Sequence, residues 1–210
     1  MVPVISFIGY HNSGKTTVAT QVVKNLVAKG YRVAVLKSTK HRKLIGDTPG
    51  KDSYRYRESG AEAVGIISPD EIVLFQNIDR DKLNLKFLSF LLFGDYDIVI
   101  CEGFKHADVP KIEVTRKELN QPLLFEKVDK VIAVVSDFPI GGIKSFSFQE
   151  TDKLTSFIEK EFISKRAKEE IDLFVNGKRV NLDESTRRAI KEILKTLSDE
   201  KRIDLRIMRK

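Results

Sequence analysis

The chain is poor in cysteine and in long apolar runs, and both shortages limit what it can be. Its 210 residues include one cysteine, Cys101, which excludes an internal disulfide framework. Every apolar stretch is interrupted by charged residues within about a dozen positions, too few to cross a bilayer. Met1 leads straight into the first predicted strand, without the pattern of a signal peptide. We therefore expect a cytoplasmic protein with no membrane partner.

The chain also lacks a block of basic residues, although its formal net charge is +7 and its pI is about 9.3. Aromatic residues are not interleaved with lysine and arginine as they are in nucleic-acid recognition motifs. The 32% of charged residues carry both signs, which is typical of a solvated surface. We expect no nucleic-acid partner. A nucleic-acid-associated ATPase stays open as an alternative, and a steep salt dependence of binding would identify it.

The segment GYHNSGKTT, residues 9–17, contains the phosphate-loop pattern G-x-x-x-x-G-K-[ST]. Its two glycines allow a tight turn in which successive backbone N–H groups point at phosphate oxygens. Lys15 would place its ammonium between the β- and γ-phosphates, and Thr16 would offer its hydroxyl to Mg²⁺. The predicted nucleotide-binding residues of this segment are Gly9, His11, Asn12, Ser13, Gly14, Lys15, Thr16 and Thr17.

The neighbouring sequence supports this assignment, because a phosphate loop needs a strand before it and a helix after it. Residues 2–8 are short, apolar and rich in β-branched side chains, as in a buried parallel strand. Residues 17–29 carry apolar side chains at helical spacing, and Gly30 can end that helix at its C′ position. Strand, loop and helix together predict that the chain binds a nucleotide.

Strands and helices alternate over the first 168 residues. Further strands are predicted at 31–37, 63–67, 72–75, 97–101, 111–115 and 130–135, and further helices at 54–59, 82–93 and 151–168. The two short strands around Ser68-Pro69-Asp70 form a hairpin, and Asp81 would cap the helix that follows it. The strand at 111–115 is indicated by its alternating polarity. This order predicts an α/β, three-layer P-loop NTPase fold with a mostly parallel sheet, spanning residues 1–168.

Residues 169–210 are predicted to form a second part, a small C-terminal α+β unit. Asn176-Gly177 is a strong hairpin signal between two short predicted strands. Asp183 can cap a helix that reaches about residue 197, and apolar residues alternate again from 202 to 208. A unit of this size is insecure alone, so we expect it to pack on the main domain or on a second subunit.

A nucleotide site also needs an acidic group at a strand end, to hold Mg²⁺ through water or to orient a nucleophile. Glu102 follows the wholly apolar stretch 98–101 and would emerge at the carboxyl edge of the sheet, where such folds bind ligands. We predict that Thr16 and Glu102 form the metal site and that Lys15 and Glu102 are the catalytic residues. Cys101 is expected to be a small buried hydrophobe.

The residues themselves leave the choice of base and the reaction open. No Asn-Lys-x-Asp base-reading motif is present, but Asp137 follows the strand at 130–135 and could accept hydrogen bonds from guanine N1 and N2. His41 follows the second strand and could reach the γ-phosphate side. A P-loop small-molecule kinase is the alternative function. The arginines available for a kinase lid are Arg42, Arg55, Arg57 and Arg116. Acceptor-dependent turnover near the usual range of about 1–10³ s⁻¹ would identify a kinase.

Residues 1–137 contain, in this order, the segments GYHNSGKTT, GYRVAVLKSTKH, DTPGKDSYRYRESGA, DIVICEGFK and PKIEVTR. The phosphate loop alone is shared by many NTPases, whereas PGKDSYRYRESGA together with EGFK is much more specific. In combination these segments resemble the molybdopterin-guanine dinucleotide biosynthesis protein B (MobB) family. The fold implied by that resemblance is a P-loop α/β domain.

The resemblance implies a protein of molybdenum cofactor maturation that binds GTP and Mg²⁺ and is at most a slow GTPase. Such proteins act as adaptors beside the guanylyltransferase that joins GMP to molybdopterin, and they are commonly dimeric. The implied partners are the molybdopterin guanylyltransferase, a second copy of the chain and, as a further candidate, molybdopterin. The resemblance assigns phosphate and Mg²⁺ binding to Gly14, Lys15, Thr16 and Thr17, with Glu102 as the acidic strand-end residue.

Overall fold

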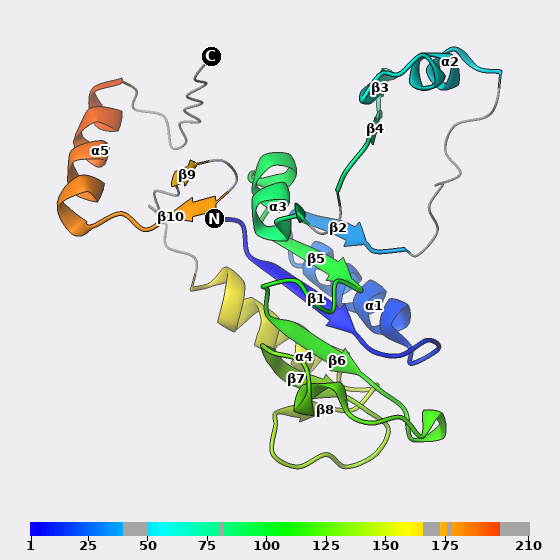
Figure 1. Cartoon of the computed structure of the whole chain (residues 1–210). Coiled ribbons are helices and arrows are strands. Elements are labelled where there is room, and N and C mark those ends of the chain that lie inside the picture. The colour runs from blue at the N-terminus through cyan, green and yellow to red at the C-terminus, as the bar shows by residue number, and fades with distance from the viewer. Residues whose placement is uncertain (40–49, 80–81, 166–172, 176–177, 198–210) are drawn as a thin grey trace.

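Six strands form one sheet in the computed structural model, which describes residues 1–39, 50–79, 82–165, 173–175 and 178–197 (Figure 1). The strands are β1 (Val4–Ile8), β2 (Val33–Lys37), β5 (Ile98–Glu102), β6 (Lys111–Val114), β7 (Val131–Val135) and β8 (Ser145–Phe146). Their order is β2-β5-β1-β6-β7-β8, and all neighbouring pairs are parallel. The predicted α/β sheet is confirmed, and the strand before the phosphate loop lies in its interior.

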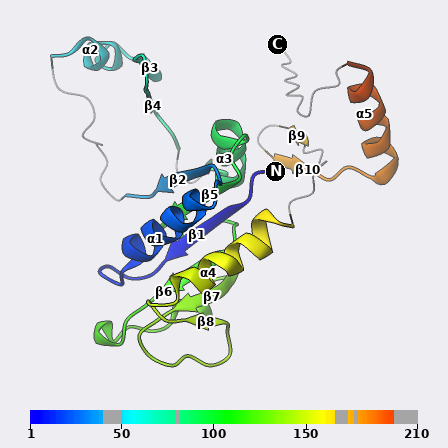
Figure 2. The same ribbon diagram turned by 180° about the vertical axis from the view of Figure 1, so that it is seen from behind.

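Helices cover both faces of this sheet and make the three predicted layers (Figures 1 and 2). One face packs against α1 (Lys15–Ala28) and α4 (Thr151–Ile158), and the other packs against α3 (Leu85–Phe93). Gly30, with a φ of 87°, follows the C-cap of α1, where a left-handed backbone favours glycine. The end of the first helix is therefore as predicted.

The start of α3 differs from the sequence prediction, which puts the cap at Asp81. The structure begins the helix at Leu85, and the Asn84 side chain accepts a hydrogen bond from the Phe87 backbone N–H at 3.1 Å. Asp and Asn are about equally good N-caps, so residue type alone did not distinguish the two positions. Asp81 itself lies outside the described residues.

Alternating residues of the interior strands supply two separate cores. Ile5 and Phe7 of β1 pack in the core shared with α1 and α4, whereas Val4 packs in the core shared with α3. Cys101 of β5 also lies in the second core, and burial raises the pKa of its thiol to about 12. The thiol therefore stays protonated, and Cys101 is the small buried side chain that the sequence predicts.

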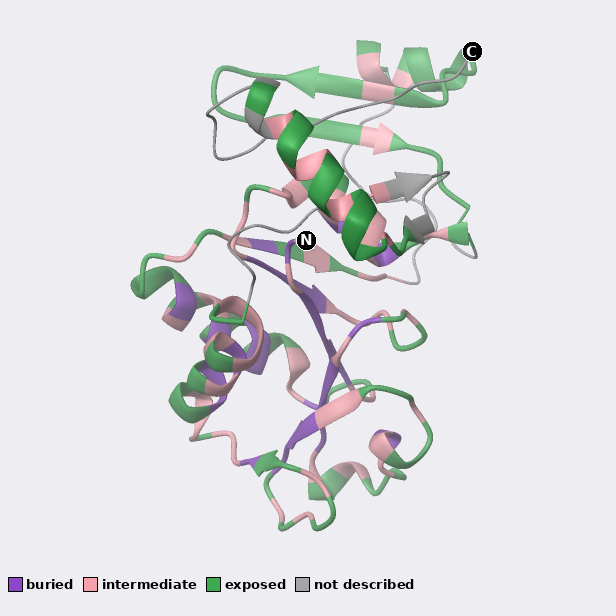
Figure 3. Cartoon of the chain, turned by 90° about the vertical axis from the view of Figure 1, so that its left-hand side faces the viewer, coloured by how far each residue is buried: buried purple, intermediate pink, exposed green. Residues whose placement is uncertain are grey.

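β6 is a strand as predicted, but its polar side chains are not exposed to solvent. Lys111 and Glu113 are buried although they are charged, and β6 lies in the interior of the sheet between β1 and β7. Figure 3 shows that much of the central sheet is coloured as buried. The Lys111 ammonium donates to two backbone carbonyls at 3.0 Å. Burial raises the pKa of Glu113, whose carboxylate accepts from the Leu124 and Phe125 backbone N–H groups at 2.8 and 2.9 Å. Glu113 thereby anchors the loop that follows β6.

Other elements lie outside the central sheet. They are α2 (Asp52–Glu58), β3 (Ala63–Ile67), β4 (Ile72–Gln76), β9 (Leu173–Val175), β10 (Lys178–Val180) and α5 (Glu184–Leu197). β3 pairs with β4, and β9 pairs with β10, and both pairs are antiparallel, as the hairpin predictions require. α2 begins at Asp52, earlier than the predicted start at residue 54. Asp183 accepts a hydrogen bond from the Thr186 backbone N–H at 2.7 Å, which confirms the predicted cap of α5. The predicted unit boundary after residue 168 and the strand at 202–208 lie outside the described residues.

Short helical turns complete the described chain. Two 3₁₀ turns, η2 (Lys117–Leu119) and η3 (Leu124–Glu126), lie between β6 and β7. The helix predicted from Thr151 continues beyond α4 as a π-helical turn, η4 (Glu159–Ile163). Within the described ranges, no helix is both long enough and apolar enough to cross a membrane.

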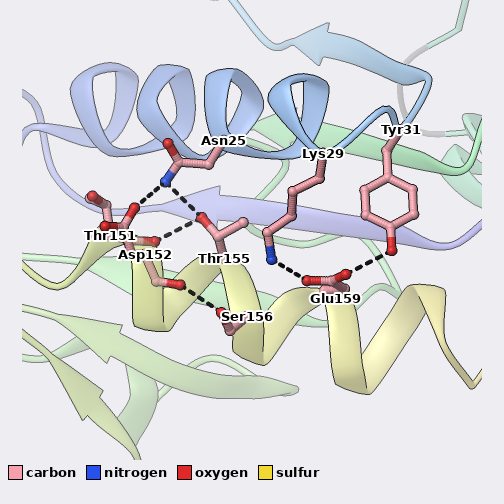
Figure 4. Close-up of polar contacts among 8 residues, drawn as sticks. All are labelled: Asn25, Lys29, Tyr31, Thr151, Asp152, Thr155, Ser156 and Glu159. Carbon is pink, nitrogen blue, oxygen red and sulfur yellow. Dashed lines mark hydrogen bonds and ion pairs between the residues drawn. The ribbon is translucent and has the colours of Figure 1, made fainter.

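Polar side chains join α1 and the residues after it to α4 and η4 (Figure 4). Asn25 donates a hydrogen bond to the Asp152 carboxylate at 2.8 Å. Glu159 accepts hydrogen bonds from the Lys29 ammonium and, at 2.7 Å, from the Tyr31 hydroxyl. The Lys29 contact, followed by the Tyr31 contact, holds the pKa of Glu159 below its ordinary value. The ionised form of Glu159 is thus favoured in the folded protein.

We expect Glu159→Gln to lower the stability of the fold at neutral pH but not in acid. Because the pKa of Glu159 is lowered on folding, its contribution is present above the unfolded pKa and is lost as the pH falls through the folded pKa. Both partners are partly exposed, so the loss should be about 0.2–1 kcal/mol at pH 7. Urea unfolding between pH 7 and 3 measures it, with Glu118→Gln as the exposed control. An equal loss at both pH values would contradict the assignment.

Candidate functional site

The phosphate loop lies where the carboxyl ends of three parallel strands meet. Phe7 of β1 pairs with Glu102 of β5, so the loop after β1 starts beside that carboxylate. On the other side the loop approaches β6 so closely that a Cβ on Gly9 would lie 2.2 Å from the Val114 carbonyl oxygen. Gly9 also has a φ of 154°, which side chains rarely adopt. Glycine is therefore required at the first position of the motif for its size and its conformation.

The loop passes directly into α1. Gly14 has a φ of 89° and is the N-cap, so the amide groups of the first turn face outward from the helix start. The Lys15 ammonium donates to the Tyr10 carbonyl at 2.5 Å and lies 3.5 Å from the Ser13 hydroxyl. Burial lowers the pKa of Lys15. The negative charge of Glu102 acts to raise this pKa, and the positive charge of Lys37 lowers it further. The helix N-terminus and this ammonium lie together and present positive charge that suits an anion.

The structure brings together the two residues predicted to hold the metal. The Thr16 hydroxyl donates a hydrogen bond to the Glu102 carboxylate at 2.9 Å. Lys37, the last residue of β2, places its ammonium 3.2 Å from the other carboxylate oxygen. A hydroxyl and a carboxylate are the hard oxygen donors that Mg²⁺ prefers, and Mg²⁺ usually keeps several waters. The pair fits such an ion, although the described residues contain no cluster of three metal-ligating side chains.

Backbone contacts fix the position of Glu102. Its carbonyl accepts a hydrogen bond from the Ser38 backbone N–H at 2.8 Å, and the Gly103 N–H donates to the Phe7 carbonyl at 2.9 Å. Gly103 has a φ of 103°, and a Cβ there would lie 2.8 Å from the Ser38 side chain. The glycine after Glu102 thus allows the chain after β2 to approach the site. Lys37 ends β2, and the carboxyl ends of strands are where the sequence places the chemistry of such a fold.

Asp137 lies after β7, on the opposite side of the phosphate loop from Glu102. Its carboxylate accepts a hydrogen bond from the Lys117 backbone N–H at 2.8 Å, and its second oxygen lies 3.8 Å from the Arg116 guanidinium. The Arg116 guanidinium stacks on the Phe148 ring, with its Cζ 4.2 Å from the ring centroid. The predicted site residues therefore occupy two sides of the loop, with Glu102 on one and Asp137 on the other.

The remaining predicted residues are spread over the loop and its surroundings. His11, Asn12 and Thr17 are exposed, whereas the Ser13 side chain is buried within the loop. Of the proposed lid arginines, Arg57 stacks on the Phe75 ring at 4.9 Å, within the peripheral hairpin region. His41 and Arg42 lie outside the described residues. The described arginines therefore do not gather into one lid.

A cleft of about 240 Å³ opens beside the Thr16–Glu102 pair, between α1 and the strands β2 and β5. Its polar end is formed by Thr16, Glu102 and Lys37, and its apolar wall includes Val23 and Val35. The cleft is therefore on the same side of the loop as the Thr16–Glu102 pair and has room for a small group beside that pair.

Comparisons with known proteins agree on one family. A family model described as "Molybdopterin guanine dinucleotide synthesis protein B" matches residues 4–137. A molybdopterin-guanine dinucleotide biosynthesis adapter protein of Escherichia coli (strain K12) is 31% identical over 162 residues, covering 75% of this chain and 92% of that protein. A protein of the same name in Haemophilus influenzae is 33% identical over 141 residues, covering 66% and 77%. A crystal structure of molybdopterin-guanine biosynthesis protein B has a TM-score of 0.59 at 32% identity, covering 75% of this chain and 97% of that one.

We expect Gly9→Ala to cost more stability than Gly30→Ala. Both residues have a positive φ, so each substitution introduces backbone strain of about 1–2 kcal/mol. No heavy atom lies within 4 Å of a Cβ on Gly30, whereas a Cβ on Gly9 would clash with the backbone of β6. The clash should add about 1–3 kcal/mol. Urea unfolding of both variants gives the comparison, and equal losses would mean that β6 does not confine the loop.

Proposed function

The chain belongs to the molybdopterin guanine dinucleotide synthesis protein B (MobB) family, and from that premise we propose that it is a GTP-binding adaptor in molybdopterin guanine dinucleotide biosynthesis. The observation that carries the nucleotide part is the contact between Thr16 and Glu102 beside the glycine loop. Two residues 86 positions apart meet where a phosphate loop requires a hydroxyl and a carboxylate. The adaptor part rests on the likeness to the adapter proteins of Escherichia coli and Haemophilus influenzae.

In this proposal the phosphates of GTP bind the backbone N–H groups of residues 9–17. Lys15 would leave the Tyr10 carbonyl and pair with phosphate oxygens, a stronger charge-assisted contact. Thr16 and Glu102 would hold Mg²⁺, which supplies neutralisation of phosphate charge when bound. Asp137, after β7, would accept hydrogen bonds from the Watson–Crick edge of guanine with the carboxylate oxygen that the Lys117 N–H does not use.

We also propose that hydrolysis of GTP is weak. The Glu102 carboxylate already accepts a hydrogen bond from Thr16 and pairs with Lys37. It is therefore better placed to bind a metal ion than to act as a general base for an attacking water. A small-molecule kinase is favoured by one observation, the cleft beside Thr16 and Glu102, which could admit a phosphoryl acceptor. Acceptor-dependent consumption of GTP would support the kinase, and slow acceptor-independent phosphate release would support the adaptor.

The proposed partner of the adaptor is the molybdopterin guanylyltransferase, with molybdopterin as a further candidate ligand. Cationic side chains near the metal side of the loop support an anionic neighbour there. Lys37 is exposed at the end of β2, and Lys24 lines the adjoining cleft. A pterin phosphate or an acidic surface of the partner enzyme would complement these ammonium groups.

We further propose that the chain forms a homodimer through the β3–β4 hairpin. Ile67 and Ile72, which face each other across the two strands, are 78% and 74% exposed, and Ile66, Val73 and Leu74 are also exposed. Neighbouring strand residues point to opposite faces, so both faces of the hairpin are apolar. A two-stranded sheet is marginally stable alone, and Figures 1 and 2 draw it apart from the six-stranded sheet. A second copy would cover this surface.

We expect Lys15→Ala to weaken GTP binding at least about 10-fold, because a charge-assisted contact to phosphate is lost. The melting temperature should stay close to that of the wild type, since the hydrogen bonds of the ammonium to the described residues are made within the loop. Isothermal titration calorimetry with Mg²⁺–GTP measures the affinity, and Lys160→Ala is the matched control on the surface of η4.

The same pair of variants tests the adaptor role. Wild type and Lys160→Ala should stimulate transfer of GMP to molybdopterin by the guanylyltransferase, and Lys15→Ala should not. Wild-type GTP affinity in a correctly folded Lys15→Ala protein would rule out the phosphate-loop assignment. Equal stimulation by all three proteins would show that stimulation of the guanylyltransferase does not require nucleotide binding by this chain.

We expect a hairpin variant that carries Ile67→Asp and Ile72→Asp to be monomeric at concentrations where the wild type is dimeric. Two carboxylates would have to be buried in the interface, which is costly without partners. Sedimentation velocity at about 1–100 μM covers the usual range of such an equilibrium. Val27→Asp, at an exposed position of α1, is the control. A monomeric wild type, or an unchanged dimer in the double variant, would refute dimerisation through this hairpin.

A further inference from the structure

A stacked group of side chains flanks the phosphate loop on the side opposite the metal residues. β6 ends at Val114 and β7 at Val135, and these two residues are paired in the sheet. Arg116 and Asp137 each follow by two residues, so the sheet places both at the same carboxyl edge. That edge adjoins the loop after β1, because β1 pairs with β6.

The Arg116 guanidinium has neighbours in three directions. One face stacks on the Phe148 ring, with Cζ 4.2 Å from the ring centroid. Nη1 of Arg116 lies 3.8 Å from the Asp137 carboxylate, which is long for an ion pair. Nε and Nη2 of Arg116 lie beside Gly14, each 3.5 Å from the position that a Cβ on Gly14 would take. The side chain is still 33% exposed. The guanidinium therefore borders the loop and remains partly open to solvent.

The supports of this guanidinium are fixed by hydrogen bonds. Phe148 lies in a turn closed by Ser147 and Glu150: the Ser147 N–H donates to the Glu150 carboxylate at 2.9 Å, and the Glu150 N–H donates to the Ser147 carbonyl at 3.1 Å. The Phe148 ring also packs against the larger core. Asp137 is oriented by the Lys117 N–H. A ring and a carboxylate that are fixed in this way give the planar guanidinium a defined orientation.

The two sides of the loop are chemically different. The side toward β5 carries Thr16, Glu102 and Lys37, which are the groups for a metal ion and charged oxygens. With the metal groups on the β5 side, the nucleoside end of a bound nucleotide would leave the loop toward β6 and β7. The planar groups next to the loop on that side are the Phe148 ring, 3.0 Å from where a Cβ on Gly14 would be, and the Arg116 guanidinium stacked on that ring. Guanidinium planes stack favourably on aromatic rings, and nucleobases present such a face.

We propose that Arg116, stacked on Phe148, forms one wall of the nucleobase site and packs against the face of the purine. This inference rests on the proposed nucleotide binding and adds the residues that hold the base. Stacking is tolerant of base identity, so the Arg116–Phe148 pair secures a purine of either kind. Asp137, whose distant pairing with Arg116 leaves an oxygen available, would supply the preference for guanine.

The test compares GTP, ATP and inorganic tripolyphosphate, each with Mg²⁺, by calorimetry. Arg116→Met and Phe148→Leu should weaken GTP and ATP binding roughly 10-fold, the usual effect of losing one stacking contact, and leave tripolyphosphate binding unchanged. Arg116→Lys keeps the charge without the plane and should behave like Arg116→Met. Circular dichroism melting of each variant confirms folding, and Phe148→Leu keeps an apolar side chain in the core.

Two matched controls come from the same chain. Arg57→Met removes a guanidinium that also stacks on a ring, and Phe157→Leu removes a ring from the same core. Neither should change any of the three affinities. Equal losses for GTP and tripolyphosphate, or rescue by Arg116→Lys, would make Arg116 a phosphate-side cation and overturn the proposal, as would unchanged binding in both Arg116→Met and Phe148→Leu. If the wild type binds neither GTP nor tripolyphosphate, the proposed function itself fails.

Discussion

The site depends on the parallel register that β1 shares with its two neighbours. Pairing of Phe7 with Glu102 brings a carboxylate from β5 to the loop, and pairing of Ile8 with Glu113 brings the end of β6 against the loop's other side. The loop passes so close to the Val114 carbonyl at the end of β6 that residue 9 has room for a glycine only. A shift of register would separate Thr16 from Glu102, because the loop would start at a different height on the sheet.

Charge is distributed unequally across this edge of the sheet. On the β5 side, Lys15 and Lys37 lie around Glu102, and burial makes the ammonium of Lys15 less favourable. An incoming polyphosphate would relieve that cost, since it supplies negative charge where two cations share one carboxylate. On the β7 side, Arg116 and Asp137 are separated by 3.8 Å and leave both groups able to contact a ligand. The two sides therefore suit the two ends of a nucleotide.

Much of the fold was accessible from the sequence, because its signals are local. The glycine spacing of the loop, the apolar run before Glu102 and the Asn176-Gly177 turn each depend on neighbouring residues only. The cap at Asn84 was missed, since several residues of the segment could cap equally well. The burial of Glu113 was not foreseen, because it depends on the position of β6 within the sheet.

The candidate site also has residues that local sequence signals identify and residues that only the fold identifies. Lys15, Thr16 and Glu102 could be named from spacing, but the Arg116–Phe148 stack joins residues from two loops that only the folded sheet brings together. Exposure of the β3–β4 hairpin also became visible only in three dimensions, because a short apolar strand pair does not reveal from its own sequence whether another element covers it. The Thr16–Glu102 contact was the long-range contact that a motif could indicate, whereas contacts without such a motif required the folded chain.

A crystal structure with a non-hydrolysable GTP analogue and Mn²⁺ in place of Mg²⁺ tests the central claim most directly. We expect triphosphate density enclosed by the backbone of residues 9–17, and an anomalous peak from the metal beside the Thr16 hydroxyl and the Glu102 carboxylate. Nucleotide density at another place on the chain, with Thr16 still bonded to Glu102 and no metal peak there, would contradict it.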